Sequence, residues 1–323
     1  NIFVPYGYME RHDLFYGFYQ PDSELGFKLQ PDLRDYKVSW MDEDVSGLYS
    51  TDNHGFRNVG RDYSTAKTYF IGDSFVFGVW VDRNKTFYGI IESALKEPVI
   101  TLGVGGYGFK QYVTLMDNFS HSHHPDTIVL GIFANDLRTL LSESYLNDYY
   151  NKAGWKKYEF ETPSYKDKSF IVQMIKVISK MNSGEVNPKE LENGLFLYER
   201  RGASPNYIAA SEYVEVEMAF LDIVDLAKQS NTRLVVVLFP SKESAYESEY
   251  LKLFPGNYLD NEKEGYARIC KIADEQGIEC VDLTPVFRAR TNKGEKLYFD
   301  KDPHWNELGN KVAAGAILPY LTK

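Results

Sequence analysis

The chain has 323 residues, of which 43% are hydrophobic and 25% are charged, so it is long enough for one α/β domain with insertions or for two domains. This composition excludes a largely disordered chain. With 36 Lys and Arg against 46 Asp and Glu, the net charge of −10 argues against nucleic acid or an anionic membrane as a partner. The apolar runs, such as residues 234–239, are far shorter than the ~20 residues that cross a bilayer, so we expect no membrane span.

The first 66 residues are rich in aromatic and turn residues, and we expect them to form an irregular or short-strand extension packed on the core. The pattern changes after this extension. Short apolar runs predict five strands, at residues 68–71, 99–102, 127–133, 233–239 and 278–283. Segments with helical spacing alternate with them, at residues 86–95, 110–119, 212–229, 262–276 and 305–321.

Alternating strands and helices of these lengths predict an α/β fold, in which helices cover a parallel sheet through right-handed crossovers. The segment 212–229 carries Val214, Met218, Leu221 and Val224 three or four residues apart, which is the spacing of a helix. Residues 141–210 break the alternation. We interpret them as an insertion or cap, with one amphipathic helix at 170–181, on a domain that spans residues 67–323.

Cys270 and Cys280 are too few for the disulfide framework of a small secreted protein, and they predict either one bridge or two buried thiols. The chain begins at Asn1 and not at Met, so we interpret it as a chain from which an upstream piece was removed. We expect a protein that works outside the cytoplasm, in the periplasm or secreted. The sequence does not indicate an oligomeric state.

Residues that carry chemistry follow the predicted strands, at the edge of the sheet where α/β folds bind ligands. Ser74 lies at a strand-to-helix turn, which exposes its hydroxyl as a nucleophile. A serine nucleophile needs a base and a group that orients the base, and His304 and Asp302 supply both from one late loop. The backbone N–H groups of Ser74 and Gly106 and the side-chain amide of Asn135 are candidate donors to an oxyanion.

These residues resemble the SGNH (GDSL-type) hydrolase superfamily of esterases, lipases and carbohydrate O-acetyl esterases or transferases. The superfamily's four blocks occur here in order: Gly72-Asp73-Ser74, Gly106, Asn135-Asp136 and the pair Asp302 and His304. The resemblance covers roughly residues 66–136 and 211–321. It implies a flavodoxin-like fold with a five-stranded parallel sheet, a serine nucleophile in a Ser-His-Asp triad, and no metal or organic cofactor.

Two blocks depart from the superfamily pattern. The glycine that usually stands next to the Asn-Asp pair is here Gly131, four residues before Asn135. The usual Asp-x-x-His spacing would place the acid at Lys301, so the orienting carboxylate is either Asp302 or Asp300, and we favour Asp302. The spacing Asp302-x-His304-Trp305 resembles the variant found in alginate O-acetylation proteins of this superfamily.

Simpler interpretations stand beside the catalytic ones. Ser74 and Asn135 are also suited to capping the helices that follow them. A cluster of histidines at residues 121–124 invites a metal site, but we interpret it as a polar loop before a strand and expect no metal.

The resemblance and the strand-end residues together predict a serine esterase that cleaves or transfers short acyl groups, above all O-acetyl groups on a saccharide, through an acyl-enzyme. A lipid esterase or thioesterase is the alternative within enzymes. A non-catalytic carbohydrate-binding scaffold is the alternative outside them, and it is disfavoured because all three triad residues are present.

Overall fold

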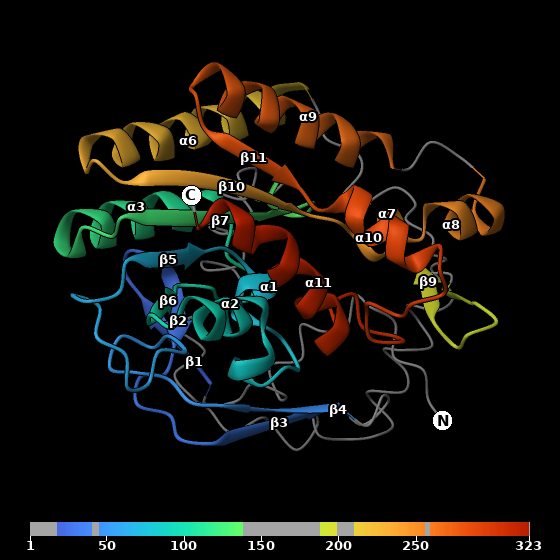
Figure 1. The fold of residues 1–323 in the computed structure, drawn as a ribbon, viewed down its shortest axis with the longest axis horizontal. Coiled ribbons are helices and arrows are strands. Elements are labelled where there is room, and N and C mark those ends of the chain that lie inside the picture. The colour runs from blue at the N-terminus through green and yellow to red at the C-terminus, as the bar shows by residue number, and fades with distance from the viewer. Residues whose placement is uncertain (1–17, 41–44, 138–187, 199–209, 256–258, 323) are drawn as a thin grey trace.

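The computed structural model describes residues 18–40, 45–137, 188–198, 210–255 and 259–322, arranged around a five-stranded parallel sheet (Figure 1). The strands are β5 (Thr68–Ile71), β6 (Val99–Thr101), β7 (Thr127–Phe133), β10 (Arg233–Phe239) and β11 (Glu279–Asp282). All five predicted strands are confirmed, with their ends displaced by at most one residue. The sheet order β11-β10-β7-β5-β6 is the flavodoxin-like order, because the second strand in the chain lies outside the first.

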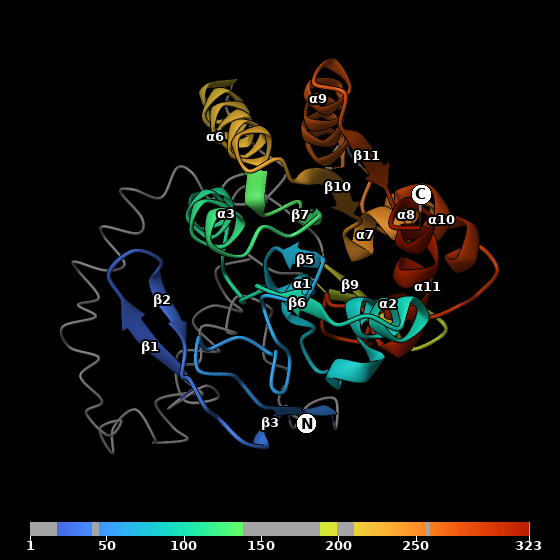
Figure 2. The same ribbon diagram turned by 60° about the vertical axis from the view of Figure 1, so that its left-hand side comes forward.

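Helices cover both faces of the sheet, as Figures 1 and 2 show. One layer contains α3 (Phe109–His123), α6 (Ala210–Gln229) and α9 (Asp260–Glu275). The other contains α2 (Phe87–Leu95), α10 (Thr284–Thr291) and α11 (Glu307–Ile317). Shorter turns of helix are α1 (Ser74–Phe77), α7 (Lys242–Ala245), α8 (Glu247–Leu253), η2 (Arg83–Lys85) and η5 (Leu318–Tyr320). The helices α7, α8 and α10 were not predicted from the sequence.

The helix predicted at 212–229 is confirmed as α6, and the structure shows which of its apolar residues are buried. Of the four apolar residues at helical spacing, Val224 is buried, while Val214, Met218 and Leu221 are 51%, 62% and 38% exposed. The helix contacts α3, α9 and β10, and its buried side chains include Val216, Phe220, Ile223, Val224 and Ala227. The helix has apolar residues on more than one side, and helical spacing alone does not say which side its neighbours cover.

Two helix ends also differ from the prediction. The helix α3 continues to His123 and is C-capped by His124 in a left-handed conformation. The prediction of a polar loop at these histidines is therefore wrong. His123 stacks on Phe119 of the same helix, with ring centroids 5.6 Å apart. The last helix begins two residues later than predicted, because the Asn306 side chain accepts a hydrogen bond from the Gly309 N–H and caps it.

The N-terminal extension forms two hairpins that pack beside the carboxyl ends of β5 and β6. They are β1 (Tyr19–Asp22) with β2 (Gly26–Leu29), and β3 (Tyr36–Trp40) with β4 (Val45–Tyr49). In Figure 2 the first hairpin lies on the side of the molecule away from α9 and β11. The ring of Tyr49 stacks on Phe77 in α1 with centroids 5.0 Å apart, which joins the extension to the first turn after β5.

Most of the predicted insertion, including the helix expected at 170–181, lies outside the described residues. Its described part is a hairpin of β8 (Pro188–Glu190) and β9 (Phe196–Tyr198), and the Phe196 N–H donates to the carbonyl of Asp300. The described helices include none that is both long and apolar enough to cross a membrane.

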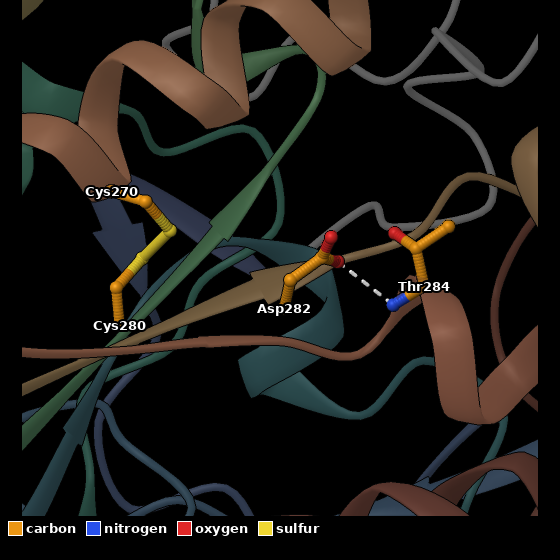
Figure 3. The surroundings of a disulfide bond; sticks show 4 residues. All are labelled: Cys270, Cys280, Asp282 and Thr284. Atoms are coloured by element: carbon orange, nitrogen blue, oxygen red, sulfur yellow. Dashed lines mark hydrogen bonds between the residues drawn. A yellow bond between two sulfur atoms is a disulfide. The ribbon is translucent and has the colours of Figure 1, made fainter.

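Cys270 and Cys280 form a disulfide that joins α9 to β11 (Figure 3). Of the two alternatives that the sequence leaves open, the structure therefore has the bridge. A few residues further on, the Thr284 N–H donates to the Asp282 carboxylate at 2.8 Å, at the point where β11 passes into α10. The bridge fixes the edge strand β11 to the helix that precedes it.

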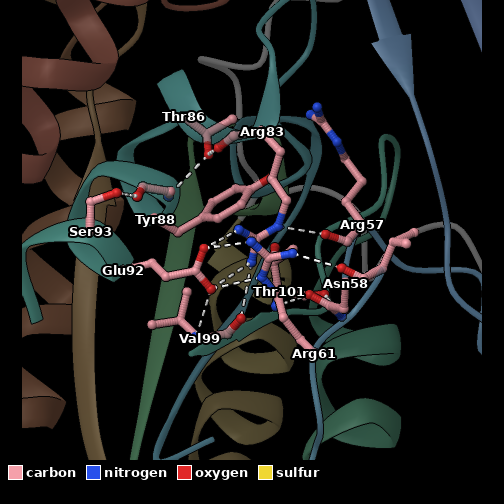
Figure 4. A network of polar contacts seen from close by, with 12 residues as sticks. Arg57, Asn58, Arg61, Arg83, Thr86, Tyr88, Glu92, Ser93, Val99 and Thr101 are labelled. Atoms are coloured by element: carbon pink, nitrogen blue, oxygen red, sulfur yellow. Dashed lines mark hydrogen bonds and ion pairs between the residues drawn. The ribbon is translucent and has the colours of Figure 1, made fainter. Parts of the chain in front are cut away.

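A half-buried charge network joins the end of the extension to α2 and β6 (Figure 4). Arg61 and Arg83 both form ion pairs with Glu92, which also accepts a hydrogen bond from the Val99 N–H. Burial alone raises the pKa of Glu92, but the hydrogen bonds from the two arginines outweigh it and lower that pKa to about 2. The folded state therefore holds Glu92 ionised.

Replacing Glu92 by Gln should lower the free energy of unfolding by roughly 1–3 kcal/mol at neutral pH, since two arginines lose their partner. The lowered pKa stabilises the fold above the usual pKa of 4.5, and this contribution is lost as the pH falls toward about 2. The difference between wild type and Glu92→Gln, measured by urea unfolding, should therefore shrink across that interval. Glu97→Gln, at an exposed ion pair with Lys67, should change stability by less than about 0.5 kcal/mol. A constant difference from pH 7 to pH 2.5 would contradict this account.

Candidate active site

Ser74 is the first residue of the short helix α1, directly after β5. The Asp73 side chain caps this helix by accepting a hydrogen bond from the Phe75 N–H at 2.9 Å. Phe75, Val76 and Phe77 are buried, which holds the turn against the core, while Ser74 is partly exposed. The sequence forms a tight strand-to-helix turn that presents the serine hydroxyl at the carboxyl edge of the sheet.

The structure brings Ser74, His304 and Asp302 together although 230 residues separate the first two. The Ser74 hydroxyl lies 2.8 Å from His304 Nε2, and His304 Nδ1 lies 2.6 Å from Asp302 Oδ1. Because an ionised carboxylate only accepts, Nδ1 is the protonated nitrogen and Nε2 accepts the Ser74 proton. Asp302 also accepts the backbone N–H of His304 at 2.8 Å, so one oxygen fixes both the backbone and the ring. This is the geometry that a serine nucleophile and its base require.

Asp302 is fully buried, yet it remains ionised. Burial by itself raises its pKa, but the charge of His304 and hydrogen bonds from His304 and Trp80 outweigh that effect and lower the pKa below its usual value. The indole N–H of Trp80 donates to the second carboxylate oxygen, Oδ2, at 2.9 Å. An ionised carboxylate beside the imidazole stabilises the positive charge that appears when His304 takes a proton.

Asp300, the other carboxylate considered from the sequence, faces away from this chain of hydrogen bonds. It forms an ion pair with Lys296 at 2.5 Å and its side chain is 48% exposed. The loop between the two acids is held by Lys242, whose ammonium donates to the carbonyls of Phe299, Asp300 and Asp302 at 2.8, 2.7 and 3.2 Å. Lys242 is fully buried at the start of α7, just after β10.

The turn after β6 lies beside the serine turn. The Val104 N–H donates to the Gly72 carbonyl, and a side chain at Gly103 would collide with the backbone of α1 at 2.4 Å. A methyl group at Gly105 would come 3.7 Å from Ser74 Cβ, and Gly106 follows with a φ of +86° in an exposed position. Gly106, a predicted oxyanion donor, thus directly follows Gly105, which lies beside Ser74.

Asn135 is exposed just beyond the end of β7. This strand pairs directly with β5, with Ile71 opposite Leu130, so the turns that carry Asn135 and Ser74 leave neighbouring strands at the same edge. The next residue, Asp136, is buried and accepts the Phe133 N–H at 2.8 Å, which closes the turn. The three predicted oxyanion donors are therefore distributed over the ends of β5, β6 and β7.

Two buried carboxyls lie beneath this edge. Burial raises the pKa of Asp73 to about 6. Burial, and then the charge of Asp73, raise the pKa of Asp136 well above its usual value. Both shifts favour the protonated, uncharged forms of these carboxyls, which limits the negative charge buried behind Ser74.

Aromatic side chains of the extension stand next to the glycine turn. The Tyr19 hydroxyl is 3.3 Å from the point where a methyl group at Gly105 would lie, and Phe27 is 3.5 Å from the corresponding point at Gly106. Tyr19 and Phe27 are both partly exposed, and their rings meet edge to face with centroids 5.6 Å apart. The buried ring of Tyr107 supports Phe27 from behind at 5.2 Å. These rings border the site beside Ser74.

Sequence reasoning missed Trp80, Lys242 and the pair Tyr19 and Phe27. Lys242 follows a buried strand, and a search of every strand end for charged residues would have found it. Trp80, Tyr19 and Phe27 carry no such signal, because their places at the site depend on contacts between distant segments.

Comparisons with known proteins agree with this architecture. Residues 195–322 match the family model of the SGNH hydrolase-like domain of the acetyltransferase AlgX, a segment that contains Asp302 and His304 but not Ser74. A search of curated proteins gives no match to the sequence.

Among solved structures, the acetyl xylan esterase AlAXEase is 14% identical with a TM-score of 0.47, and the alignment covers 79% of this chain and 98% of that one. A catalytic mutant of an acetylxylan esterase from Geobacillus stearothermophilus is 15% identical with a TM-score of 0.45, covering 79% and 94%. A putative acylhydrolase from Bacteroides fragilis is 15% identical with a TM-score of 0.44, covering 79% and 86%. With TM-scores this low, the assignment depends on the family match and on the order of the parallel strands. On those two findings, the fold is SGNH hydrolase-like, and residues 195–322 are similar to the domain found in AlgX.

Proposed function

We propose that this protein is a serine esterase or O-acyltransferase that acts on short acyl esters, above all O-acetyl groups, of a saccharide. The observation that carries this proposal is the continuous chain of hydrogen bonds from Ser74 through His304 to Asp302, with contacts of 2.8 and 2.6 Å. These three residues are the catalytic triad in the proposed mechanism. The match to an acetyltransferase family model supports the choice of an acyl ester as substrate.

In the proposed reaction the Ser74 oxygen attacks the ester carbonyl while His304 Nε2 takes the hydroxyl proton. Asp302 stabilises the imidazolium, and the N–H groups of Ser74 and Gly106 with the Asn135 amide hold the oxyanion. The C–O bond of the ester then breaks, and His304 returns its proton to the leaving sugar oxygen. Water or another sugar hydroxyl attacks the acyl-enzyme and gives its proton to His304. The bond between the acyl carbon and the Ser74 oxygen then breaks, His304 returns the proton to that oxygen, and the acid or the new ester is released. This chemistry uses side chains and backbone groups of the protein alone.

The aromatic border of the site supports a saccharide as the group that carries the ester. Tyr19 and Phe27 present partly exposed rings beside Gly105 and Gly106, where a sugar attached to the acyl group would leave the serine. Aromatic rings offer large, rigid apolar faces, and a tyrosine adds a hydroxyl that hydrogen bonds to sugar hydroxyls.

The disulfide supports a location outside the cytoplasm, because structural disulfides persist in oxidising compartments such as the periplasm. Fractionation of the source cells should find the protein outside the cytoplasmic fraction, with Cys270 and Cys280 oxidised.

Ser74→Ala should lower kcat for a short acyl ester by roughly 10³-fold or more, because the nucleophile is lost. The test combines p-nitrophenyl acetate turnover with mass spectrometry of the intact protein, in which only the wild type should carry a trapped acetyl group. Acetylated glycans with and without a free acceptor sugar then distinguish hydrolysis from transfer by their products. Unchanged turnover in Ser74→Ala would remove the nucleophile and with it the proposed function.

Asp302→Asn should leave the fold intact and reduce kcat by up to ~10⁴-fold, because the imidazole loses the acceptor that fixes its tautomer. Asp300→Asn is the matched control. It removes an exposed ion pair with Lys296, so kcat should stay within about twofold. Circular dichroism of both variants checks folding. If Asp300→Asn has the larger effect, the assignment of the orienting acid is wrong.

Phe27→Ala should raise KM for an acetylated oligosaccharide about five- to tenfold, by loss of ring contacts worth about 1 kcal/mol. Turnover of p-nitrophenyl acetate, which has no sugar, should change less than threefold. Leu48→Ala, which removes an exposed apolar side chain elsewhere in the extension, should affect neither substrate. Equal losses on both substrates would mean that Phe27 supports the turn and does not bind sugar.

A further inference from the structure

Trp80 lies in the loop after α1, and its indole ring reaches the acid of the candidate triad. The indole N–H donates to Asp302 Oδ2 at 2.9 Å, while Oδ1 accepts both the ring and the backbone of His304. Both Asp302 and the indole are buried, with exposures of 0% and 5%. Donors on both oxygens hold the carboxylate in one orientation about its own axis, with Oδ1 turned toward the imidazole.

The backbone of Trp80 adopts a conformation that an aromatic residue rarely takes. Its φ is +61°, in the left-handed region, where the side chain of an L-residue is crowded. A residue stays in that region only when its surroundings hold it there. The Trp80 N–H donates to the hydroxyl of Tyr49 at 2.8 Å, and Tyr49 belongs to β4 of the N-terminal extension.

Arg57 of the same extension holds the loop on both sides of Trp80. Its guanidinium donates to the carbonyls of Phe77 and Gly78 at 2.7 and 2.9 Å, and to that of Val81 at 3.0 Å. The side chain is buried between aromatic rings, 4.8 Å above the ring of Tyr49 and 5.2 Å above that of Phe77. The planar guanidinium, with its several N–H donors, suits a side chain that donates to three carbonyls while it stacks between two aromatic rings.

We propose that Trp80 is a positioning residue that orients Asp302 toward His304, and that Tyr49 and Arg57 make the N-terminal extension a working part of the active site by holding Trp80 in place. This inference rests on the proposed function, since it assigns Asp302 to the triad. It explains why a segment outside the hydrolase domain packs its buried polar side chains around the loop that follows the nucleophile.

Trp80→Phe keeps an aromatic ring and removes the indole N–H. Because hydrogen bonds to charged groups are strong, kcat for p-nitrophenyl acetate should fall about ten- to a hundredfold, with KM within about twofold. The rate at which a fluorophosphonate probe labels Ser74 should fall by a similar factor. The proton between His304 Nδ1 and Asp302 should give a low-field NMR resonance in the wild type, and Trp80→Phe should lose or shift it.

Trp305→Phe is the matched control. Trp305 is also buried and adjoins His304, but its indole nitrogen makes no hydrogen bond to Asp302 in the described part of the chain. This variant should lose thermal stability and keep the low-field resonance in place. If Trp80→Phe keeps both the resonance and the labelling rate of the wild type, or if both variants lose the resonance alike, the positioning role is overturned.

Tyr49→Phe tests the part played by the extension. It keeps the ring under Arg57 and removes the hydroxyl that accepts the Trp80 N–H, so the labelling rate should fall about three- to tenfold. Tyr69→Phe, which removes a buried hydroxyl bonded to the Tyr63 carbonyl, should leave that rate unchanged. Equal rates in Tyr49→Phe and wild type would overturn the role of the extension. If the probe fails to label wild-type Ser74, the proposed function fails, while the NMR resonance still decides whether Trp80 orients Asp302.

Discussion

Asp302 is an ionised carboxylate that is fully buried, and much of the structure follows from that constraint. A buried charge is tolerated only when donors and an opposite charge surround it. Here the donors come from segments far apart in the chain: His304 from the same loop and Trp80 from the loop after α1. The ammonium of Lys242 fixes the backbone of the Asp302 loop from the end of β10. Movement of any of these segments would expose the carboxylate or remove a hydrogen bond that it accepts. The fold and the geometry around Ser74 are therefore stabilised by the same contacts.

The N-terminal extension makes contacts with the candidate active site that its sequence does not predict. Arg57 and Tyr49 fix the loop that carries Trp80, while Tyr19 and Phe27 border the glycine turn beside Ser74. The ion pairs of Glu92 with Arg61 and Arg83 then join the end of the extension to α2. The extension thus contacts the site at two places, the loop of Trp80 and the glycine turn beside Ser74. Under the proposed function, one set of contacts acts on catalysis and the other on the choice of substrate.

Under the proposed function, different parts of the chain act on the acyl group and on the sugar that carries it. In that proposal Ser74, His304 and the donors at the ends of β5, β6 and β7 attack the ester, and they occupy positions that the parallel sheet creates. The aromatic rings that border these positions come from the hairpin of β1 and β2. Because the two sets belong to different parts of the chain, a change of carrier requires changes in the extension and leaves the triad untouched.

The sequence by itself determined the elements whose physics is local. The apolar runs at 127–133 and 233–239 are strands because both of their faces are buried, and the turn at Ser74 forms because Asp73 caps the helix after it. The choice of Asp302 over Asp300 as the contact of His304 also followed from spacing within one loop. Only the tertiary structure decided which face of α6 is buried, that Cys270 pairs with Cys280, and that Trp80 meets Asp302 across 222 residues. Such contacts depend on how distant segments pack together, and neither periodicity nor spacing along the chain contains that information.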